Sequence, residues 1–265
     1  MVYPEFTHTL FEVEGHVAYL TFNEPKKRNP MGYDVSGEII RACDVCDDDD
    51  NIRCLVLRGA GGNFSAGGDM LVMKDAVDRG LVTSRPIVRI AADAGWRLRS
   101  LKKPAIAWIE GAIAGSGLAL AAACDFSIID ENSKCVFAFV NIGFVPDTGA
   151  AFFVARAVGT TRASDLLMSG RIFRGREAVE MGLFTEAVPK DQLEKRVREY
   201  IDKYSNGPTV AYANIKQMIN RVQYAGYHLV SQQEIEMQAL CEMTEDHKEA
   251  VYAFLEKRPA KFTGR

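Results

Sequence analysis

Strand-like and helix-like runs alternate along roughly the first 190 residues of this chain. Short runs rich in β-branched and aromatic residues predict strands at 16–22, 54–58, 105–109 and 126–129. Between them, apolar residues recur at helical spacing and predict helices near 31–46, 86–101, 116–123 and 149–168. Such alternation is typical of the α/β class, in which helices cover a largely parallel sheet.

The pattern changes near residue 190 and stays helical from there on. Amphipathic stretches predict helices at 190–204, 208–225, 229–243 and 246–257, with few strand signals between them. Pro208 is well placed to begin one of these helices. We therefore predict two parts, an α/β core over 1–190 and a C-terminal helical segment over 191–265.

The size and charge of the chain exclude several classes of protein. Its 265 residues, 48% of them hydrophobic, can bury a substantial core. No apolar run is long enough for a transmembrane helix, and the N-terminus lacks a signal-peptide pattern, so we expect a cytoplasmic protein without membrane contact. A net charge of -3 argues against nucleic-acid binding, although basic clusters at 26–28, 102–103 and 257–258 could hold a compact polyanion.

Neither the cysteines nor the histidines are spaced for metal binding. The six cysteines are scattered through mostly apolar segments, and we expect them to be reduced. Cys43 and Cys46 form a C-x-x-C pair on a helical pattern without a second pair or a nearby histidine, which favours packing over metal ligation. The four histidines show no ligand spacing either. We therefore predict no metal site.

Two glycine-rich turns follow predicted strands, at 59–69 (GAGGNFSAGGD) and 111–118 (GAIAGSGL). Glycines there let the backbone approach a ligand closely. The second turn leads into a helix, whose first N–H groups lack partners and favour an anion or an oxygen that is gaining charge. For either turn alone, close packing of the strand and the helix is the alternative. Neither turn matches a Walker loop or a G-x-G-x-x-G motif, so those modes of nucleotide binding are not predicted.

These turns belong to a set of motifs that covers almost the whole chain. In order, the motifs are 23–31 (NEPKKRNPM), 64–69 (FSAGGD), 103–107 (KPAIA), 111–118 (GAIAGSGL), 124–125 (CD) and 253–258 (AFLEKR). Together they resemble the crotonase, or enoyl-CoA hydratase/isomerase, superfamily. The resemblance implies a spiral of β-β-α units followed by a helical trimerisation segment, assembled as a homotrimer or a dimer of trimers. It also implies an acyl-CoA substrate, with coenzyme A as part of the substrate and no tightly bound cofactor.

The resemblance implies that the backbone N–H groups of Gly68 and Ser116 bind the thioester oxygen of the substrate. Removing a proton next to a thioester, or adding to its conjugated alkene, drives charge onto that oxygen, so preorganised donors lower the barrier. Ser116 stands where the family usually has glycine. A serine is tolerated there because the donor is the main-chain N–H and not the side chain. We expect its hydroxyl to cap the helix rather than contact the ligand.

The hydratases of the family use two glutamates, which the resemblance places at Ala119 and Phe139. Neither position carries an acid, so hydration by two carboxylates is not supported. The acid lies instead at Asp147, where aspartate-dependent enoyl-CoA isomerases, ring-epoxyphenylacetyl-CoA isomerases among them, carry theirs. The segment 89–97 lacks the histidine that an aryl-CoA dehalogenase of the family also needs.

We therefore predict that Asp147 removes a proton from one carbon of an enoyl-CoA and returns it to another, while the two N–H groups bind the enolate oxygen. Apolar neighbours at Phe139, Phe144 and Val145 should disfavour the ionised carboxylate and raise its pKa. The alternative for Asp147 is structural, as a cap of the helix that begins near residue 149.

The resemblance also implies where coenzyme A binds. Its nucleotide should lie near Lys26, Arg28 and Ala66, and Phe254 and Lys257 should reach it from an adjacent subunit. For the lysines, an ordinary solvated side chain is the alternative.

The sequence also suggests roles for several other side chains. Asp69 should order the first glycine turn, with a contact to the ligand as the alternative, and Asp125 should be structural. Some large side chains could line an aromatic-sized acyl pocket or pack in the core: Met73, Phe137, Phe139, Phe144 and Phe152. Fatty-acid and aromatic-acid thioesters are therefore both candidate substrates.

Other activities stay open on the sequence. An atypical hydratase or an acyl-CoA thioester hydrolase could use Asp147 alone to orient water. A non-catalytic acyl-CoA-binding protein would keep the fold, but a pure binder needs no acid in an apolar turn. Because one fold supports many reactions, the reaction has to be argued from the site.

Overall fold

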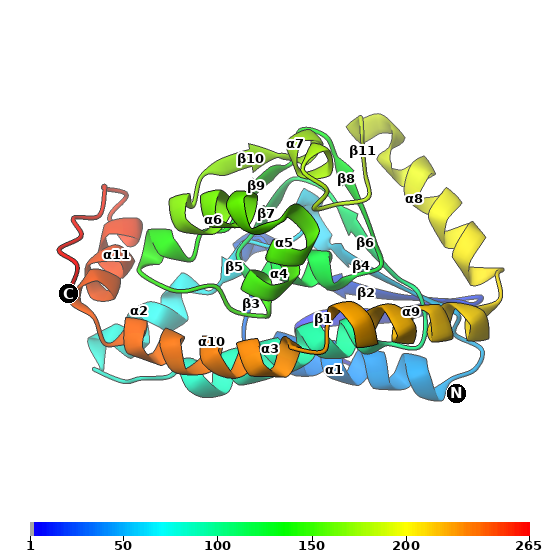
Figure 1. The fold of residues 1–265 in the computed structure, drawn as a ribbon, viewed down its shortest axis with the longest axis horizontal. Helices are drawn as coiled ribbons and strands as arrows, with labels where there is room; N and C mark the ends of the chain where they lie inside the picture. The colour runs from blue at the N-terminus through cyan, green and yellow to red at the C-terminus, as the bar shows by residue number, and fades with distance from the viewer. Residues whose placement is uncertain (1–2) are drawn as a thin grey trace.

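A six-stranded sheet forms the centre of the computed structural model, which describes residues 3–265 (Figure 1). Its strands lie in the order β1 (Thr9–Glu14), β2 (Val17–Phe22), β4 (Cys54–Gly59), β6 (Ala105–Ile109), β8 (Phe126–Asp130) and β11 (Glu186–Val188). β1 and β2 form an antiparallel hairpin, and the other neighbours pair in parallel. The predicted strands correspond to β2, β4, β6 and β8, so the α/β class is confirmed.

Two small sheets carry the glycine-rich turns. One contains β10 (Ile172–Arg174), β9 (Lys134–Val136) and β7 (Ala112–Ala114), and in the other β3 (Pro30–Met31) pairs with β5 (Gly67–Gly68). These strands have only two or three residues. They are too short for an alternating pattern to be visible in the sequence.

Helices surround the sheets. The α-helices of the described residues are α1 (Tyr33–Asp48), α2 (Met70–Asp78), α3 (Ser84–Ser100), α4 (Ser116–Ala123), α5 (Ala150–Val158), α6 (Thr160–Ser169), α7 (Gly175–Glu180), α8 (Lys190–Ser205), α9 (Thr209–Gln223), α10 (Tyr227–Glu242) and α11 (Glu245–Leu255). Short 3-10 helices are η1 (Pro25–Lys27), η2 (Ala60–Gly62) and η3 (Val140–Ile142). The prediction of one helix over 149–168 is wrong, because Gly159, at φ 78°, separates α5 from α6.

Both faces of the central strands of the main sheet are largely buried, as is usual for parallel strands, whereas the edge strand β1 alternates exposed and less exposed residues. Since successive side chains point to opposite faces, Val56 and Ile128 face one side, where they pack with Val197 of α8. Leu55 and Leu57 face the other side and join the larger core with residues of α1, α3 and α4. The sheet is therefore a rigid base from which the connecting turns project.

The C-terminal helices pack along this core. α10 runs beside α3, and α11 packs against α2 and η3 (Figure 1). Tyr227, at the start of α10, is buried, and its hydroxyl donates a hydrogen bond to the carbonyl of Ala92 on α3 at 2.8 Å. α10 is thereby fixed against the helix that lies next to the glycine-rich turns.

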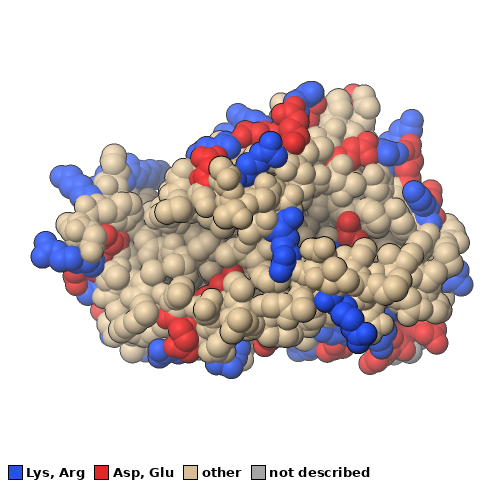
Figure 2. All heavy atoms as spheres, viewed as in Figure 1, with Lys and Arg blue, Asp and Glu red and all other residues tan. Residues whose placement is uncertain are grey.

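The surface carries both charges and exposed apolar side chains. Figure 2 shows acidic and basic side chains interspersed around the edge of one face, with largely uncharged surface in its middle. Along α9, α10 and α11 the exposed large apolar side chains are Val210, Ile215, Met218, Ile219, Val222, Leu229, Met237, Leu240 and Phe254. Of the helices within residues 3–265, none combines the length and the apolar character that crossing a membrane requires.

Candidate active site

Hydrogen bonds tie together three turns that are distant in the sequence. The side-chain amide of Asn29 donates to the carbonyls of Ala60 and Asn63, at 2.9 and 2.8 Å. The hydroxyl of Ser65 donates to the Asn29 carbonyl at 2.8 Å, and the Ser65 carbonyl accepts from the N–H of Ala114 at 2.9 Å. The motifs near residues 29, 65 and 114 thus form one rigid unit.

The two glycine-rich turns meet within this unit. Gly67 has φ 80°, and a Cβ there would lie 3.1 Å from the carbonyl oxygen of Ala114. Gly115 has φ 49°, and a Cβ there would lie 3.7 Å from the Cα of Gly67. Gly68 and Ser116 directly follow these two glycines, and Ser116 is the first residue of α4, so its N–H has no acceptor within the helix.

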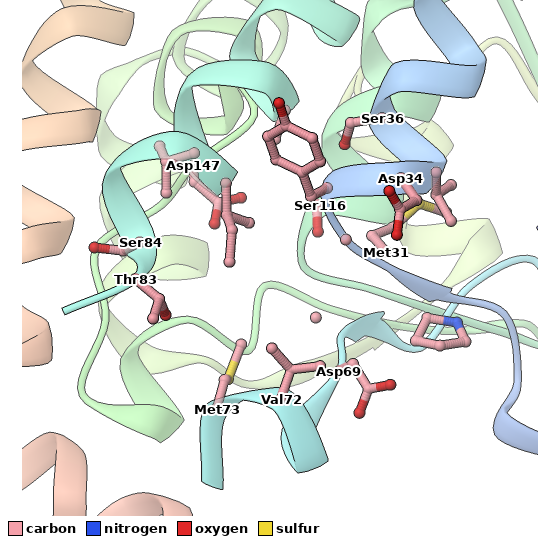
Figure 3. A pocket seen from close by; sticks show the side chains of 18 of the residues that line it. Met31, Asp34, Ser36, Asp69, Val72, Met73, Thr83, Ser84, Ser116 and Asp147 are labelled. Carbon is pink, nitrogen blue, oxygen red and sulfur yellow. The ribbon is translucent and has the colours of Figure 1, made fainter. Parts of the chain in front are cut away.

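Gly68, Ser116 and Asp147 line one pocket with a volume of about 380 Å³ (Figure 3). That volume lies within the roughly 300–1,000 Å³ typical of small-ligand sites. In Figure 3, Val72 and Met73 of α2 lie across the cavity from Ser116 and Asp147. The structure therefore brings together the three residues that the sequence proposed as catalytic.

Ser116 differs from its prediction in one respect. The residue that precedes α4 is Gly115, and no side chain caps the helix there. Ser116 is itself the first helical residue, is only 7% exposed and lines the pocket. The expected capping role of its hydroxyl is therefore wrong, because the helix begins one residue earlier than a serine cap would require.

Asp147 lies between η3 and α5, and two donors hold its carboxylate. Oδ1 accepts from the Thr148 hydroxyl at 2.8 Å, and Oδ2 accepts from the side-chain amide of Gln238 on α10 at 3.2 Å. Burial raises the pKa of Asp147 from 3.8 to about 6, although the Thr148 bond acts in the opposite direction. Its side chain is half-buried, and it lines the pocket. Such a carboxylate is ionised at neutral pH, yet its pKa suits the transfer of a proton.

The turn that carries Asp147 is strained. Thr148 has φ 60°, a conformation that β-branched residues rarely adopt. Glu234 of α10 accepts a hydrogen bond from the N–H of Gly149 at 2.9 Å, and this N–H lies at the start of α5. The side chain of Asp147 makes no cap for α5, so the structural alternative for this residue is wrong. Its position is fixed by α10 instead.

The two positions of the family's glutamates are apolar and packed. Ala119 is fully buried within α4, and Phe139 is 6% exposed. A Cβ added to Gly115 would lie 3.7 Å from the ring of Phe139, so the ring covers the second glycine-rich turn. No second carboxylate therefore enters from either position.

The two acids expected to be structural are structural. Asp69 caps α2, because its Oδ1 accepts from the N–H of Leu71 at 2.9 Å. Asp125 forms ion pairs with the buried side chains of Arg99 and Lys216, the latter at 2.7 Å. Asp125 is therefore engaged in buried ion pairs, whereas Asp69 both caps α2 and lines the pocket.

Three further acids line the pocket. Glu24 and Asp34 lie near His8, whose ring nitrogens are 3.5 and 3.8 Å from their oxygens. Glu242 of α10 is fully engaged, because it accepts from the N–H groups of Thr83 and Ser84 at 2.9 to 3.0 Å. The sequence did not single out His8 for this pocket.

The predicted coenzyme A contacts are not part of this pocket. Lys26, Arg28 and Ala66 are exposed, and they are not among the described residues that line it. Lys27 lines it instead, with its amine 3.5 Å from Asp69. Phe254 is 60% exposed on α11, also outside the lining. Lys257 follows α11 with φ 56°.

The candidate acyl-pocket aromatics divide between pocket and core. Phe144 and Met73 line the pocket. Phe137, Phe139 and Phe152 are buried in the main core. Of the aromatic residues that the sequence proposed for the acyl pocket, only Phe144 therefore lines the pocket of Asp147.

The cysteines agree with their packing role. Cys43 and Cys46 are free thiols, and both are buried in the main core. Burial also raises the pKa of both thiols. Within residues 3–265, no group of three His, Cys, Asp or Glu side chains is arranged to hold a metal ion.

α10 contributes polar residues to the site that the sequence motifs do not predict. Gln238 and Glu242 line the pocket, and Glu234 lies next to the turn of Asp147. These polar residues recur every four positions on the buried face of the helix. That spacing was a visible signal, since polar residues on a buried face need a reason.

Comparisons with known proteins agree with this geometry. Residues 12–265 match the family described as Enoyl-CoA hydratase/isomerase. The chain is 36% identical to a trans-2-decenoyl-[acyl-carrier-protein] isomerase of Streptococcus mutans, covering 98% of this chain and 100% of the relative. It is 32% identical to a 1,2-epoxyphenylacetyl-CoA isomerase of Escherichia coli, covering 97% and 98%.

A solved structure agrees on the fold. An enoyl-CoA hydratase from Mycobacterium avium subsp. paratuberculosis superposes with a TM-score of 0.88 at 28% identity, covering 98% of this chain and 100% of that chain. The chain belongs to the enoyl-CoA hydratase/isomerase family and has the crotonase fold. It is an enzyme of that family, as the resemblance of its motifs predicted.

Proposed function

We propose that this enzyme is an enoyl-thioester isomerase in which Asp147 carries a proton between two carbons of the acyl chain. The observation that carries the proposal is one half-buried carboxylate with a raised pKa in the same pocket as Gly68 and Ser116. The positions that hold the glutamates of a hydratase are Ala119 and Phe139, which are buried and apolar. One base and one oxyanion site suit a proton shuttle better than the addition of water.

The proposed step needs no other reactant. The carboxylate of Asp147 takes a proton from C4 of a 2-enoyl thioester, and the C–H electron pair becomes the C3=C4 double bond. The electrons of the C2=C3 bond move toward C1, so negative charge develops on the thioester oxygen. The N–H groups of Gly68 and Ser116 stabilise that charge. Asp147 then returns the proton to C2, which gives a 3-enoyl thioester and regenerates the base.

The pocket lining and the name of one relative support an aliphatic acyl chain. Apolar side chains from α2 and α3 surround the space near Asp147: Val72, Met73, Ile87, Val88 and Ala91. The name of the Streptococcus mutans relative specifies a decenoyl group on acyl carrier protein, and that of the Escherichia coli relative specifies a CoA thioester. We therefore propose a medium-chain enoyl thioester as substrate, with coenzyme A or acyl carrier protein as its carrier.

The proposal includes a homotrimer or a dimer of trimers. The exposed apolar side chains along α9, α10 and α11 support association, because monomers rarely expose so many large apolar groups together. Phe254 and Lys257 lie outside the pocket of their own chain, so we propose that they act on the carrier bound to a neighbouring subunit. Light scattering measures the assembly, and Phe254→Ala should raise KM more than it lowers kcat.

Product analysis tests the proposed reaction. The purified enzyme is incubated with 2-decenoyl, 3-decenoyl and decanoyl thioesters, each on coenzyme A and on acyl carrier protein. We expect the two enoyl thioesters to interconvert without a change of mass. A 3-hydroxyacyl product would identify a hydratase, free thiol would identify a hydrolase, and binding without any product would identify a non-catalytic protein. Asp147→Asn should abolish turnover, while the matched control Asp34→Asn, at an exposed acid of the same pocket, should retain it.

A further inference from the structure

Three polar residues of α10 recur at four-residue intervals on its buried face. Glu234, Gln238 and Glu242 are 5%, 2% and 7% exposed. Each contacts a different segment in or next to the pocket, namely the start of α5, the carboxylate of Asp147 and the start of α3. We call these three residues the polar stripe of α10. In Figure 1 this helix runs beside α3, below the turn that connects η3 to α5.

The polar stripe is costly for folding, because a buried polar atom without a partner loses its hydration. Within the described part of the chain, Oε1 of Glu234 and Oε1 of Gln238 are buried and have no hydrogen-bond partner. Apolar side chains of similar size would avoid that cost. Buried polar atoms left unpaired in a folded protein call for a functional explanation.

Both residues act on the segment that carries the base. Gln238 donates to Oδ2 of Asp147 at 3.2 Å. Glu234 accepts from the N–H of Gly149, two positions along, at 2.9 Å. Between these two contacts lies Thr148, whose left-handed backbone costs about 1–2 kcal/mol for a residue with a branched Cβ. α10 thereby holds the strained turn in place from both ends.

The carboxyl groups of Asp147 and Glu234 also influence each other. Burial raises the pKa of Asp147 to about 6, and burial together with the charge of Asp147 raises the pKa of Glu234 to about 8. Asp147 therefore ionises first, and Glu234 keeps its proton at neutral pH. Other titratable groups packed around the pair are Asp93 on α3, Tyr227, Cys241 and Glu242 on α10, and His247 on α11.

Three of these other groups carry no charge near neutral pH. Burial raises the pKa of Tyr227 and of Cys241, and burial lowers the pKa of His247, so all three are neutral at pH 7. Glu242 is bound by three donors at the start of α3. Gln238 and Glu234 are therefore the stripe residues that act on the carboxylate of Asp147.

We propose that Gln238 and Glu234 are positioning residues that set the orientation and the proton affinity of Asp147. Gln238 stabilises the ionised carboxylate by donating to Oδ2, and Glu234 fixes the turn while remaining uncharged beside it. Their assignment to a proton-transfer reaction rests on the proposed function. Their effect on Asp147 does not, because the titration of a carboxylate can be measured without any substrate.

The direct test is a titration of Asp147 in the full-length protein, followed by carbon-13 NMR of labelled aspartate carboxyls and assigned with Asp147→Asn. Gln238→Leu removes the donor, and the titration midpoint of Asp147 should rise by about one pKa unit or more. The matched control is Gln233→Leu, which makes the same change on the exposed face of α10 and should leave the midpoint unchanged. A folded Gln238→Leu protein with the wild-type midpoint would overturn the role of Gln238.

A second variant covers the case in which Gln238→Leu does not fold. Gln238→Glu keeps the length of the side chain, converts the donor into an acceptor, and should raise the midpoint of Asp147 further. In the wild type, the carboxyl resonance of Asp147 should show a second inflection near pH 8, where the neighbouring Glu234 loses its proton. Glu234→Gln should abolish this second inflection and leave the first titration step, that of Asp147 itself, in place. If Glu234→Gln lowers the midpoint of Asp147 markedly, then Glu234 is ionised beside it and the proposed division of roles is wrong.

Kinetics separate this inference from the proposed function. With an active isomerase, Gln238→Leu should lower kcat about tenfold and leave KM nearly unchanged, since the base is affected rather than binding. If no double-bond migration occurs with any thioester, the proposed function fails, but the shift in the titration still confirms the positioning role. If migration occurs and both the titration and kcat are unchanged in folded variants, the positioning role fails alone.

Discussion

Replacing Asp147 with asparagine should stabilise the folded protein at neutral pH while removing its chemistry. Burial raises the pKa of Asp147 from 3.8 to about 6, so the folded state binds this proton more tightly than the unfolded state does. The stability of the wild type therefore falls as pH rises from the unfolded pKa to the folded one, and the full loss persists above it. The asparagine side chain does not titrate, so the variant escapes this loss.

The magnitude follows from the difference between the two pKa values. At about 1.4 kcal/mol per pKa unit, the loss in the wild type is roughly 1 kcal/mol at pH 4.5 and roughly 3 kcal/mol at pH 7. The titration of Asp147 itself should thus add at most about 2 kcal/mol to the stability advantage of Asp147→Asn between these pH values, an upper limit for this contribution because the pocket admits water. The charge of Asp147 also raises the pKa of Glu234, and its removal adds to the gain in the same direction.

The assay is urea unfolding of both proteins at the two pH values, at one protein concentration, followed by tryptophan fluorescence. Taking the difference between the two pH values cancels any constant effect of the new amide on packing or hydrogen bonding. An advantage that is the same at both pH values would refute the reasoning, because it would mean that burial does not displace the titration of Asp147.

Three further substitutions test the site and its support. Ser116→Ala should change kcat little, since the donor is the main-chain N–H; a large loss would assign the hydroxyl a direct role. Gly67→Ala should lower kcat about tenfold or more without greatly changing KM, because residues with a Cβ rarely adopt φ 80° and the added Cβ would lie only 3.1 Å from the Ala114 carbonyl oxygen, so the neighbouring oxyanion donor should shift. Asp125→Asn should lower the free energy of unfolding by about 3–5 kcal/mol, because it leaves the buried ammonium of Lys216 without its carboxylate; urea unfolding within about 1 kcal/mol of wild type would contradict this.

Long periodic segments could be predicted from the sequence, because their own residues carry the signal. α4 begins and ends where predicted, at 116 and 123, and β6 occupies the predicted 105–109. The short strands β3, β5 and β7 could not be predicted, because the partner strand rather than a local pattern makes them strands. The break at Gly159 was visible as a glycine, but glycine inside a helical pattern is often tolerated.

The sequence motifs predict the parts of the site that consist of main-chain turns or of one acid within a motif. Gly68 and Ser116 meet in one pocket because the turns that carry them are tied together by Asn29 and Ser65, whereas Asp147 is held at the same pocket by Gln238 of α10. The contributions of α10 depend on how a distant helix docks, which no local motif specifies. Lys27 rather than Lys26 lines the pocket, which no local pattern indicates, and the contact of Lys26 with the coenzyme A nucleotide stays a prediction.

Exchange of solvent deuterium tests the central claim most directly, that Asp147 moves a proton along an enoyl thioester. A 2-decenoyl thioester is incubated in deuterated water with the wild type and with Asp147→Asn, and label at C2 and C4 is followed by NMR. We predict that the wild type migrates the double bond with label confined to these two carbons, and that Asp147→Asn loses migration and exchange together by roughly a hundredfold or more. Migration at the wild-type rate in folded Asp147→Asn, or a product with water added at C3, would contradict the account.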